Sequence, residues 1–336
     1  MGSGMRTVVV REYGGPQVLE AARAPVPEPG PGEVLVKIAY AGVNPADWRI
    51  RSGRVRRFGT PPFPIGLDLA GTVEAAGPEV TRFRPGDRVY GVTIPPRGSY
   101  AQYAAVPETQ LAAAPRHAGL REAAALPVTG LTAWQALERA GTVGEGSRVL
   151  VHAAAGGVGH LAVQLAKARG AYVIGTAREA NHAFVRGLGA DEVLDYTATD
   201  FAAELAADDR RVDAVIDPIS SDYGLRSLQV LRAGGVLVDV RGTGPDRTAL
   251  RARAGALGLG LVELSFTPSG EDLATLATMV DRDLLRVSLA RTYPLELAAE
   301  AHASSESGRT RGKIVLSIDT DPAPDLEADI DADPVP

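Results

Sequence analysis

The sequence predicts a protein of the α/β class, in which a doubly wound parallel sheet is joined to a second, β-rich domain. Three observations predict it. From Leu126 onward, short β-branched runs alternate with helical stretches at the spacing of βαβ units. The first hundred or so residues instead carry β-branched runs separated by Gly and Pro. Between a strand and a helix of the alternating part lies a glycine-rich turn.

The β-rich part begins with four short strand-like runs. They read TVVVREY (7–13), GEVLVKIAYAGV (32–43), AGTVEAAG (70–77) and GDRVYGV (86–92), with a proline-rich run at 25–31. Because Gly and Pro end strands and favour turns, we expect each run to be a separate strand of a β domain.

The alternating part begins with the helical stretch LTAWQALERAG (131–141). We expect strands at 149–152, 172–175, 192–194, 212–216 and 236–240, and helices that end at 168, begin near 181, and lie near 201–207 and 223–231. After about Phe266 come two more helical stretches and a closing strand, KIVLSI (313–318).

These textures divide the chain into four segments. We expect a first domain from 5–126, a parallel-sheet domain from 127–266, and a return of the chain to the first domain at 267–318. The remaining stretch, 319–336, is acidic and rich in Pro, and it has few large apolar residues, so we expect it to be disordered.

The composition excludes several classes of protein. The chain has 336 residues, of which 45% are hydrophobic, and 41 acidic against 35 basic residues give a net charge of −6. This acidic balance disfavours a nucleic-acid partner. The absence of cysteine excludes disulfides, thiolate zinc ligands and a cysteine nucleophile. No apolar run approaches the roughly 20 residues of a membrane span, and no signal peptide is visible, so we expect a cytoplasmic protein without a membrane partner.

The glycine-rich turn has the pattern Ala154-x-Gly156-x-x-Gly159, between a predicted strand and a predicted helix. A turn without side chains lets the backbone approach a pyrophosphate, and the helix N-terminal amides point at it. We therefore expect the cofactor to bind here, at Ala155, Gly156, Gly157 and Val158. The alternative is a tight strand–helix junction that binds nothing.

The second strand of this unit ends Gly175-Thr176-Ala177-Arg178, without the acidic residue that binds the ribose hydroxyls of NAD. A carboxylate there repels a 2′-phosphate, whereas Thr176 and Arg178 can accept one, so the sequence favours NADPH over NADH. Glu179 beside Arg178 weakens this preference. The alternative for Arg178 is an ordinary solvated residue.

With these motifs in hand, the chain resembles the zinc-independent quinone oxidoreductase and enoyl reductase branch of the medium-chain dehydrogenase/reductase superfamily. The resemblance is carried by AGVNPADWRIRSG, GLDLAGTVEAAGPEVTRFRPGDRVYG, AAALPVTGLTAWQAL, AAAGGVGHLAVQLAK, LGADEVLDY, LRAGGVLVDV and SGRTRGKIVL, among other stretches that run nearly from end to end. It implies a GroES-like β-barrel catalytic domain, discontinuous in sequence, around a Rossmann domain. It also implies a homodimer paired through the Rossmann domains.

The resemblance also indicates that no metal is bound. Zinc-dependent relatives place Cys and His ligands in the segments where this chain has Asn44 and Leu67. Asp47 and Asp68 remain, but two carboxylates without nitrogen or sulfur partners make a poor zinc site. Without a Lewis acid, hydride delivery to an already electrophilic carbon is the chemistry that remains.

By resemblance, several residues contact the cofactor or the substrate. The expected catalytic residues are Asn44, Asp47 and Thr129, and the expected cofactor contacts are Asn44, Thr129, Ala155, Gly156, Gly157, Val158, Gly175, Thr176, Arg178, Tyr196, Val240, Arg241 and Lys313. Asn44 could instead be a turn residue before Pro45, and Thr129 a helix cap. Tyr196 could be a surface aromatic, and Lys313 a plain strand-start lysine.

Five arginines, Arg49, Arg51, Arg54, Arg56 and Arg57, lie within one loop-like segment of an acidic protein. Relatives use this loop near the mouth of the active site, so an anionic substrate would suit it. We expect Trp48, Arg54, Arg57 and Asp68 to contact the substrate. The alternative is a solvated basic loop.

These inferences predict an NADPH-dependent, metal-free oxidoreductase that reduces a quinone or the activated C=C bond of an α,β-unsaturated carbonyl. One alternative is an enoyl-reductase-type tailoring enzyme of polyketide-like biosynthesis. Another is a non-catalytic NADPH-sensing binding protein, which Pro218 and the Arg178–Glu179 pair, both departures from the family pattern, keep open. His152 and His160 are expected to be structural, and Tyr40, Tyr100 and Tyr293 remain equal candidates for the proton donor.

Overall fold

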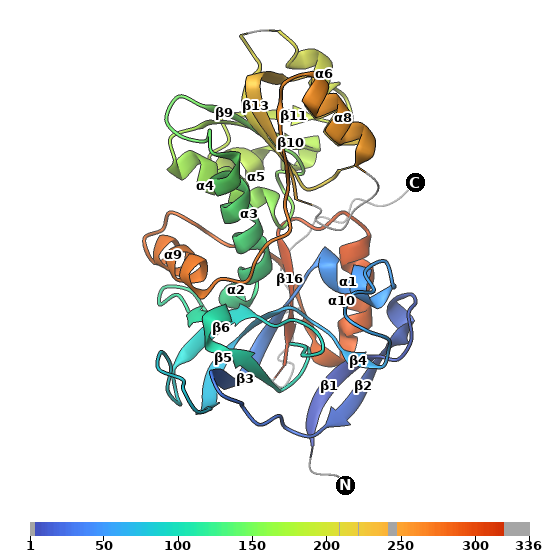
Figure 1. The fold of residues 1–336 in the computed structure, drawn as a ribbon, viewed down its shortest axis with the longest axis vertical. Coiled ribbons are helices and arrows are strands. Elements are labelled where there is room, and N and C mark those ends of the chain that lie inside the picture. Colours follow the sequence, from blue (N-terminus) through green and yellow to red (C-terminus); the bar gives the residue numbers. More distant parts are fainter. Residues whose placement is uncertain (1–3, 208, 221, 241–246, 319–336) are drawn as a thin grey trace.

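The computed structural model describes residues 4–207, 209–220, 222–240 and 247–318. Figure 1 shows two lobes stacked along the long axis, with the N-terminal strands in one lobe and the strands β9–β14 in the other. Helices α2 and α3 lie between them. The chain passes from the first lobe to the second and then returns through α9, α10 and β16.

The first lobe is built mainly from antiparallel strands. Its strands are β1 (Met5–Val10), β2 (Leu19–Ala24), β3 (Glu33–Val43), β4 (Phe63–Pro64), β5 (Asp68–Ala76), β6 (Arg88–Val92), β7 (Tyr103–Pro107), β8 (Leu111–Ala113), β15 (Leu289–Pro294) and β16 (Lys313–Ser317). They form a three-stranded sheet in the order β2-β1-β4 and a larger sheet in the order β15-β16-β3-β5-β6-β8, with β7 also paired to β3.

The second lobe is a six-stranded parallel sheet in the order β11-β10-β9-β12-β13-β14. Its strands are β9 (Arg148–Val151), β10 (Tyr172–Ala177), β11 (Glu192–Asp195), β12 (Val212–Asp217), β13 (Leu231–Asp239) and β14 (Gly260–Glu263). The order reverses at β9, so the carboxyl ends of β9 and β12 flank a crevice of the kind that binds ligands in such sheets.

Helices cover the sheets and connect the lobes. They are α1 (Pro45–Arg51), α2 (Leu120–Ala124), α3 (Pro127–Ala140), α4 (Gly159–Ala168), α5 (His182–Gly187), α6 (Phe201–Glu204), α7 (Asp222–Ser227), α8 (Thr248–Ala256), α9 (Gly270–Asp281) and α10 (Ala298–Glu306), with single 3₁₀ turns at Pro16–Val18, Glu108–Gln110, Glu179–Asn181 and Leu295–Leu297. None of the helices within the described residues is long and apolar enough to cross a membrane.

Strand β16 (Lys313–Ser317) returns the chain to the first lobe. It pairs antiparallel with β3, with Ile314 opposite Val43 and Ser317 opposite Tyr40. Segments separated by about 270 positions therefore share one sheet, and this pairing brings Lys313 next to Asn44.

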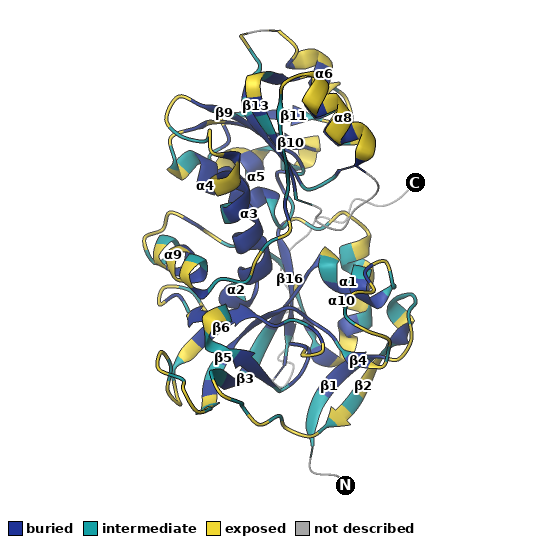
Figure 2. Ribbon diagram, in the orientation of Figure 1, coloured by how far each residue is buried: buried dark blue, intermediate teal, exposed yellow. Residues whose placement is uncertain are grey.

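The central strands of the parallel sheet are buried on both faces, as Figure 2 shows for β9 and β10, while α8 is largely exposed. Continuous apolar runs such as Val149, Leu150 and Val151 suit this position, because both sides of each strand pack against helices. Helix α3 is buried along most of its length and belongs to the core that joins the two lobes.

The predicted α/β class and its two architectures are confirmed, while several element boundaries differ. The helix expected near 223–231 ends at Ser227, because Leu231 already begins β13 and pairs with Val212. The α8, β14 and β15 elements were not expected. The acidic stretch 319–336 lies outside the described residues.

The arginine-rich segment, expected to be loop-like, begins with helix α1. Asn44 is its N-cap residue, Pro45 occupies the first turn, and Asp47 is at the third helical position, a strong helix-start pattern. Arg49 and Arg51 therefore belong to a helix, and Arg51 is buried at 1% exposure.

The pairing of β3 with β5 depends on Gly71, because an added Cβ would lie 2.0 Å from the carbonyl oxygen of Lys37. We expect Gly71→Ala to lower the thermal unfolding midpoint, at a cost of roughly 1–3 kcal/mol for overpacking. Gly187→Ala is the matched control, since a Cβ there meets no atom within 4 Å. Equal midpoints for the two variants in a thermal denaturation experiment would contradict this reading.

Candidate active-site cleft

A cleft of about 280 Å³ lies where the glycine turn faces the first lobe. Its walls come from Val43, Pro45, Thr129, the 156–159 turn, Pro218 and the 305–314 segment that leads into β16. The cleft therefore contains the end of β9 from one lobe and the start of β16 from the other.

The glycine turn is shaped to leave this cleft open. Ala153 adopts a positive φ of 47° directly after β9, and α4 begins at Gly159. A Cβ on Gly157 would approach the Lys313 side chain to 3.2 Å and that of Thr129 to 3.3 Å, so a larger residue would fill the space. Gly159 allows close packing, since a Cβ there would lie 2.2 Å from the oxygen of Ala153. The backbone is thus exposed at a helix N-terminus, where an anionic group binds favourably.

The turn is joined to the other lobe by main-chain and side-chain contacts. The carbonyl oxygen of Ala155 accepts a hydrogen bond of 2.9 Å from the backbone N–H of Gly312. His160, in the first turn of α4, bonds Gly156 O through Nδ1 and accepts from Ser288 N at 3.3 Å through Nε2. Burial lowers the pKa of His160 to about 4, so the ring is neutral and structural.

The end of β10 presents one of the expected cofactor residues and buries two. Arg178 is exposed, and its Nε donates to Tyr196 Oη at 2.9 Å, so these two residues form a pair at the surface beyond the end of β10. Gly175 is buried, and a Cβ there would lie 2.9 Å from the side chains of Ala154 and Val185, which makes it a packing residue.

Thr176 is fully buried, and its hydroxyl oxygen lies 3.2 Å from His152 Nδ1 and 3.3 Å from Ala153 N. This geometry does not support the expectation that Thr176 accepts a 2′-phosphate. Burial lowers the pKa of His152 to about 3, so this neutral histidine ties β9 to β10 and, through Ser227, to α7.

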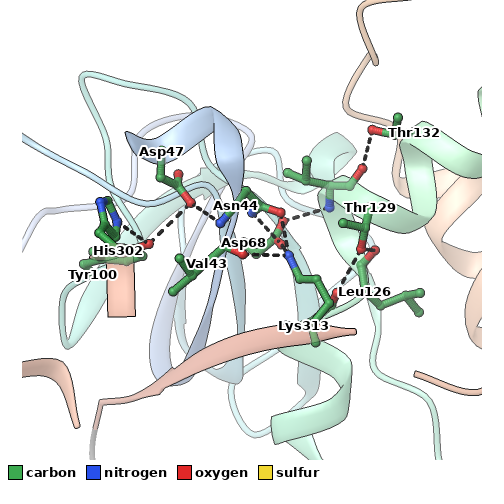
Figure 3. Close-up of polar contacts among 12 residues, drawn as sticks. Val43, Asn44, Asp47, Asp68, Tyr100, Leu126, Thr129, Thr132, His302 and Lys313 are labelled. Carbon is green, nitrogen blue, oxygen red and sulfur yellow. Dashed lines mark hydrogen bonds and ion pairs between the residues drawn. The ribbon is translucent and has the colours of Figure 1, made fainter. Parts of the chain in front are cut away.

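At the base of the cleft lies the buried ammonium group of Lys313. Its Nζ donates to the carbonyl oxygen of Val43 at 3.0 Å and to Asn44 Oδ1, and it lies 3.4 Å from Asp68 Oδ2 (Figure 3). Lys313 is 3% exposed and Asp68 is 0% exposed, so the charges of this ion pair are removed from water. Lys313 does begin β16, as the alternative had it, but its side chain is buried and paired rather than that of a plain strand-start lysine.

Asn44 is held between these two charges. Its side-chain Nδ2 donates to Asp68 Oδ2 at 2.9 Å while its Oδ1 accepts from Lys313, which fixes the orientation of the amide. Asp68 also accepts from the backbone N–H of Val128 at 2.8 Å, in the first turn of α3. The carboxylate is therefore placed at a helix N-terminus, where the helix dipole favours negative charge.

Burial acts on both members of this ion pair. Burial raises the pKa of Asp68. Lys313, Asn44 and the backbone N–H of Val128 act in the opposite direction, because each of them favours the charged carboxylate. Burial lowers the pKa of Lys313. The carboxylates of Asp68 and Asp47 act in the opposite direction, because they favour the charged ammonium group. With three donors on Asp68 and oxygen acceptors around Lys313, the charged forms of both groups are satisfied.

Asp47, the carboxylate that was expected to be catalytic, lies behind Asn44 rather than at the base of the cleft. Its Oδ2 accepts from the backbone N–H of Asn44 at 2.7 Å and from the hydroxyl of Tyr100 at 3.3 Å (Figure 3). Burial, and then the charge of Asp68, raise the pKa of Asp47 to about 7.

Thr129 lies in the cleft wall but does not cap its helix. Helix α3 begins at Pro127, and the Thr129 hydroxyl donates back to the oxygen of Ala125 at 3.0 Å. The helix-cap alternative is therefore wrong, and the methyl side of Thr129 faces the glycine turn at Gly157.

The expected substrate residues other than Asp68 surround α1. The guanidinium carbon of Arg54 lies 5.7 Å from the centre of the Trp48 ring. The guanidinium carbon of Arg57 lies 4.8 Å from the centre of the Phe58 ring. Arg51 differs from these exposed arginines, because it is buried against His302 and Glu306 of α10.

Two residues with a place near the site were not expected in that role, Tyr100 as a partner of Asp47 and His302 as a partner of Tyr100. No local motif marks His302, because its partners are 202 and 251 positions away in the sequence. Val240 directly follows β13, and its N–H donates to Asp217 O at 3.1 Å. Arg241 lies outside the described residues.

Comparisons with known proteins agree with this architecture. Residues 30–116 match the alcohol dehydrogenase GroES-like domain, and residues 188–316 match the zinc-binding dehydrogenase family. A chloroplast envelope quinone oxidoreductase homolog of Arabidopsis thaliana is 35% identical over 323 residues, which cover 93% of this chain and 98% of that protein. The quinone oxidoreductase of Mus musculus is 32% identical, with 94% and 98% covered.

Solved structures give the same result. The quinone oxidoreductase of Coxiella burnetii has a TM-score of 0.86 at 34% identity, covering 94% of this chain and all of that one. The Escherichia coli quinone oxidoreductase, solved with NADPH, has a TM-score of 0.84 at 28% identity, covering 93% and 99%.

A GroES-like domain and a doubly wound parallel sheet that meet at this cleft define a member of the medium-chain dehydrogenase/reductase superfamily, a class of oxidoreductases. Within that superfamily, the chain belongs to the quinone oxidoreductase family.

The oxygen atoms of Val43, Asn44 and Asp68 suit an ammonium group, because an ammonium group donates hydrogen bonds to them. Among the residues that the structure describes, no group of three or more His, Cys, Asp or Glu side chains is arranged to hold a metal ion. The positive charge beside Asn44 and Asp68 is the ammonium group of Lys313.

The buried ion pair makes a testable energetic prediction. Lys313→Met leaves Asp68 buried without its counter-charge, and removing one partner of such a pair costs roughly 3–5 kcal/mol. We expect the double variant Lys313→Met/Asp68→Asn to recover part of this loss, because it leaves no uncompensated charge. Denaturant unfolding of the two single variants and the double variant measures the coupling, and simple additivity would contradict it.

Proposed function

We propose that this chain is an NADPH-dependent, metal-free reductase that delivers hydride to a quinone or to the activated C=C bond of an α,β-unsaturated carbonyl. The observation that carries the proposal is the cleft in which the glycine turn faces a buried ammonium group across Gly157. A pyrophosphate fits the first feature, and developing negative charge on a substrate oxygen fits the second.

The residues of the glycine turn would hold a dinucleotide. Gly156 and Gly157 leave room that a Cβ would fill, and the N-terminus of the ten-residue helix α4 offers its amides to the diphosphate. Arg178 and Tyr196, joined by a hydrogen bond, would form the exposed end of the site, and the guanidinium group of Arg178 would supply positive charge for a 2′-phosphate. Of the two residues expected in this role, only Arg178 is retained.

When bound, the nicotinamide supplies the hydride. The protein's part is to position the reactants and to stabilise charge. The ammonium group of Lys313, fixed by Val43 O and Asn44 and paired with the carboxylate of Asp68, belongs to the wall of the cleft. A substrate oxygen that gains negative charge as hydride arrives at a conjugated carbon would be stabilised near this cation, and a proton taken from water would complete the reduction.

The substrate remains a proposal by class. The quinone oxidoreductases among the relatives favour a quinone, and the exposed Arg54 and Arg57 beside α1 are compatible with an anionic substituent. We also propose a homodimer that pairs through the parallel-sheet domains, in which β14 is the outer strand beside β13.

The function is tested by mixing the protein with NADPH and a panel of quinones and enones, and following the absorbance of NADPH. We expect its oxidation with at least one acceptor. NADPH binding without turnover on any acceptor would favour a cofactor-sensing protein instead, and the absence of binding would overturn the proposal.

Cofactor preference has its own test. Arg178→Ala removes a charged donor, so we expect NADPH affinity to fall by about tenfold to a hundredfold while NADH affinity changes little. Arg186→Ala, an exposed arginine of α5, is the matched control. Fluorescence titration measures both cofactors, and equal losses for NADPH and NADH would show that Arg178 does not bind the 2′-phosphate.

A further inference from the structure

A row of buried polar side chains runs behind Asn44, away from the cleft. Arg51 of α1, His302 of α10, Tyr100 before β7 and Asp47 of α1 are each at most 1% exposed. Arg51 ends the row just beneath the surface, where its buried Nη2 pairs with the carboxylate of Glu306. We call these four residues the Arg51–Asp47 row.

The hydrogen bonds of this row have one allowed direction. Arg51 only donates, so the His302 Nδ1 atom, 3.3 Å from Arg51 Nη1, must accept. A neutral His302 then carries its proton on Nε2, which donates to Tyr100 Oη at 3.0 Å. The Tyr100 hydroxyl in turn donates to Asp47 Oδ2 at 3.3 Å.

The two central groups keep the protons that this direction requires. Burial lowers the pKa of His302 to about 3, so the ring is neutral at physiological pH. Burial and the charge of Asp47 hold the pKa of Tyr100 well above its usual value, so the hydroxyl keeps its hydrogen. The rings pack edge to face at 5.6 Å, and Gly66 makes room for Tyr100, since a Cβ there would lie 2.3 Å from its ring.

The row ends on the carboxylate that fixes Asn44. Asp47 Oδ2 accepts both the Tyr100 hydroxyl and the backbone N–H of Asn44, the latter at 2.7 Å. Every donor in the row therefore favours the charged form of Asp47, and that charge holds the first turn of α1 in place (Figure 3).

We propose that Tyr100 and His302 are positioning residues, which keep Asp47 ionised and thereby hold Asn44 in register with Lys313 and Asp68 at the base of the cleft. The proposal rests on the proposed function only in that Asn44 contributes to the reductase site. It differs from a simple tie between α1 and α10, because it acts through the charge of one carboxylate.

This difference is visible as a pH dependence. The carboxylate of Asp68 faces Asp47 and disfavours its negative charge. The ammonium group of Lys313 and the hydroxyl of Tyr100 favour that charge. Arg51 and Glu306 lie further along the row. Burial and Asp68 raise the pKa of Asp47 to about 7, so the carboxylate is lost as pH falls through this value. Removing the Tyr100 donor raises this pKa further and moves the loss to higher pH.

The first experiment compares pH profiles of kcat/KM for NADPH-dependent quinone reduction. For Tyr100→Phe we expect the acidic limb to move up by about one pH unit, which gives an activity on the order of tenfold lower than wild type at pH 6 and about equal activity at pH 9. His302→Phe, which keeps a ring but removes the donor, should move the limb in the same direction. A variant that only loosens the packing would lose activity equally at all pH values, and that result would overturn the proposal.

The matched control is Tyr90→Phe. Tyr90 is also a fully buried tyrosine of the first lobe, but its hydroxyl donates to the carbonyl oxygen of Leu273, away from Asp47. Its acidic limb should coincide with that of wild type. A shift equal to that of Tyr100→Phe would assign the effect to the loss of any buried hydroxyl and overturn the specific role of the row.

The second experiment does not need turnover. Proteins labelled with ¹³C at aspartate carboxyl groups are titrated by NMR, and the signal absent from Asp47→Asn identifies Asp47. The Asp47 titration midpoint should rise in Tyr100→Phe and in His302→Phe but not in Tyr90→Phe. An unchanged midpoint overturns the positioning role even if quinone reduction is confirmed, and a raised midpoint supports it even if no quinone is reduced.

Discussion

The ammonium group of Lys313 is the point on which the site is built. It joins three segments that are far apart in the sequence: the end of β3 at Val43, the start of β5 at Asp68, and β16. A charge buried this deeply persists only if oxygen acceptors surround it, so the positions of those acceptors are fixed together. Asn44 bridges the two charges, and its amide is therefore oriented by both.

The cofactor domain is tied to the same point. Gly312, the residue before Lys313, donates its N–H to Ala155 in the glycine turn, and Thr129 of α3 faces that turn at Gly157. The turn that would hold the diphosphate and the cation that would stabilise the substrate oxygen therefore share one stretch of backbone. A displacement of the turn is transmitted to Lys313 through a single residue.

The sequence predicted those parts of the structure whose signal is local. The βαβ alternation, the Gly156–Gly159 pattern and the β-branched runs each depend on neighbouring residues, and they gave the fold class and the place of the cleft. Helix α1 was missed because five arginines resembled a solvated loop, although the Asn-Pro-x-Asp start is itself a helix signal.

The partners within the site were not predictable in the same way. The contact between Lys313 and Asn44 spans 269 positions, and that between Tyr100 and His302 spans 202, so no spacing in the sequence reveals them. Thr176 is a residue whose sequence position did suggest a contact, because it lies near the end of the strand that follows the glycine-rich turn and its helix. Side chains alternate along a strand, however, and the hydroxyl of Thr176 points inward to His152. Burial and orientation, rather than residue type, separate these cases.

The pairing of β16 with β3 also bears on the order in which the protein is completed during synthesis. The six strands of the parallel sheet are contiguous in the chain, so that domain can form as soon as it leaves the ribosome. The first lobe, although β1–β8 are made earlier, lacks Lys313 until β16 emerges. Until then Asp68 has no partner in Lys313, and β16 supplies both the neighbour of β3 and the missing counter-charge.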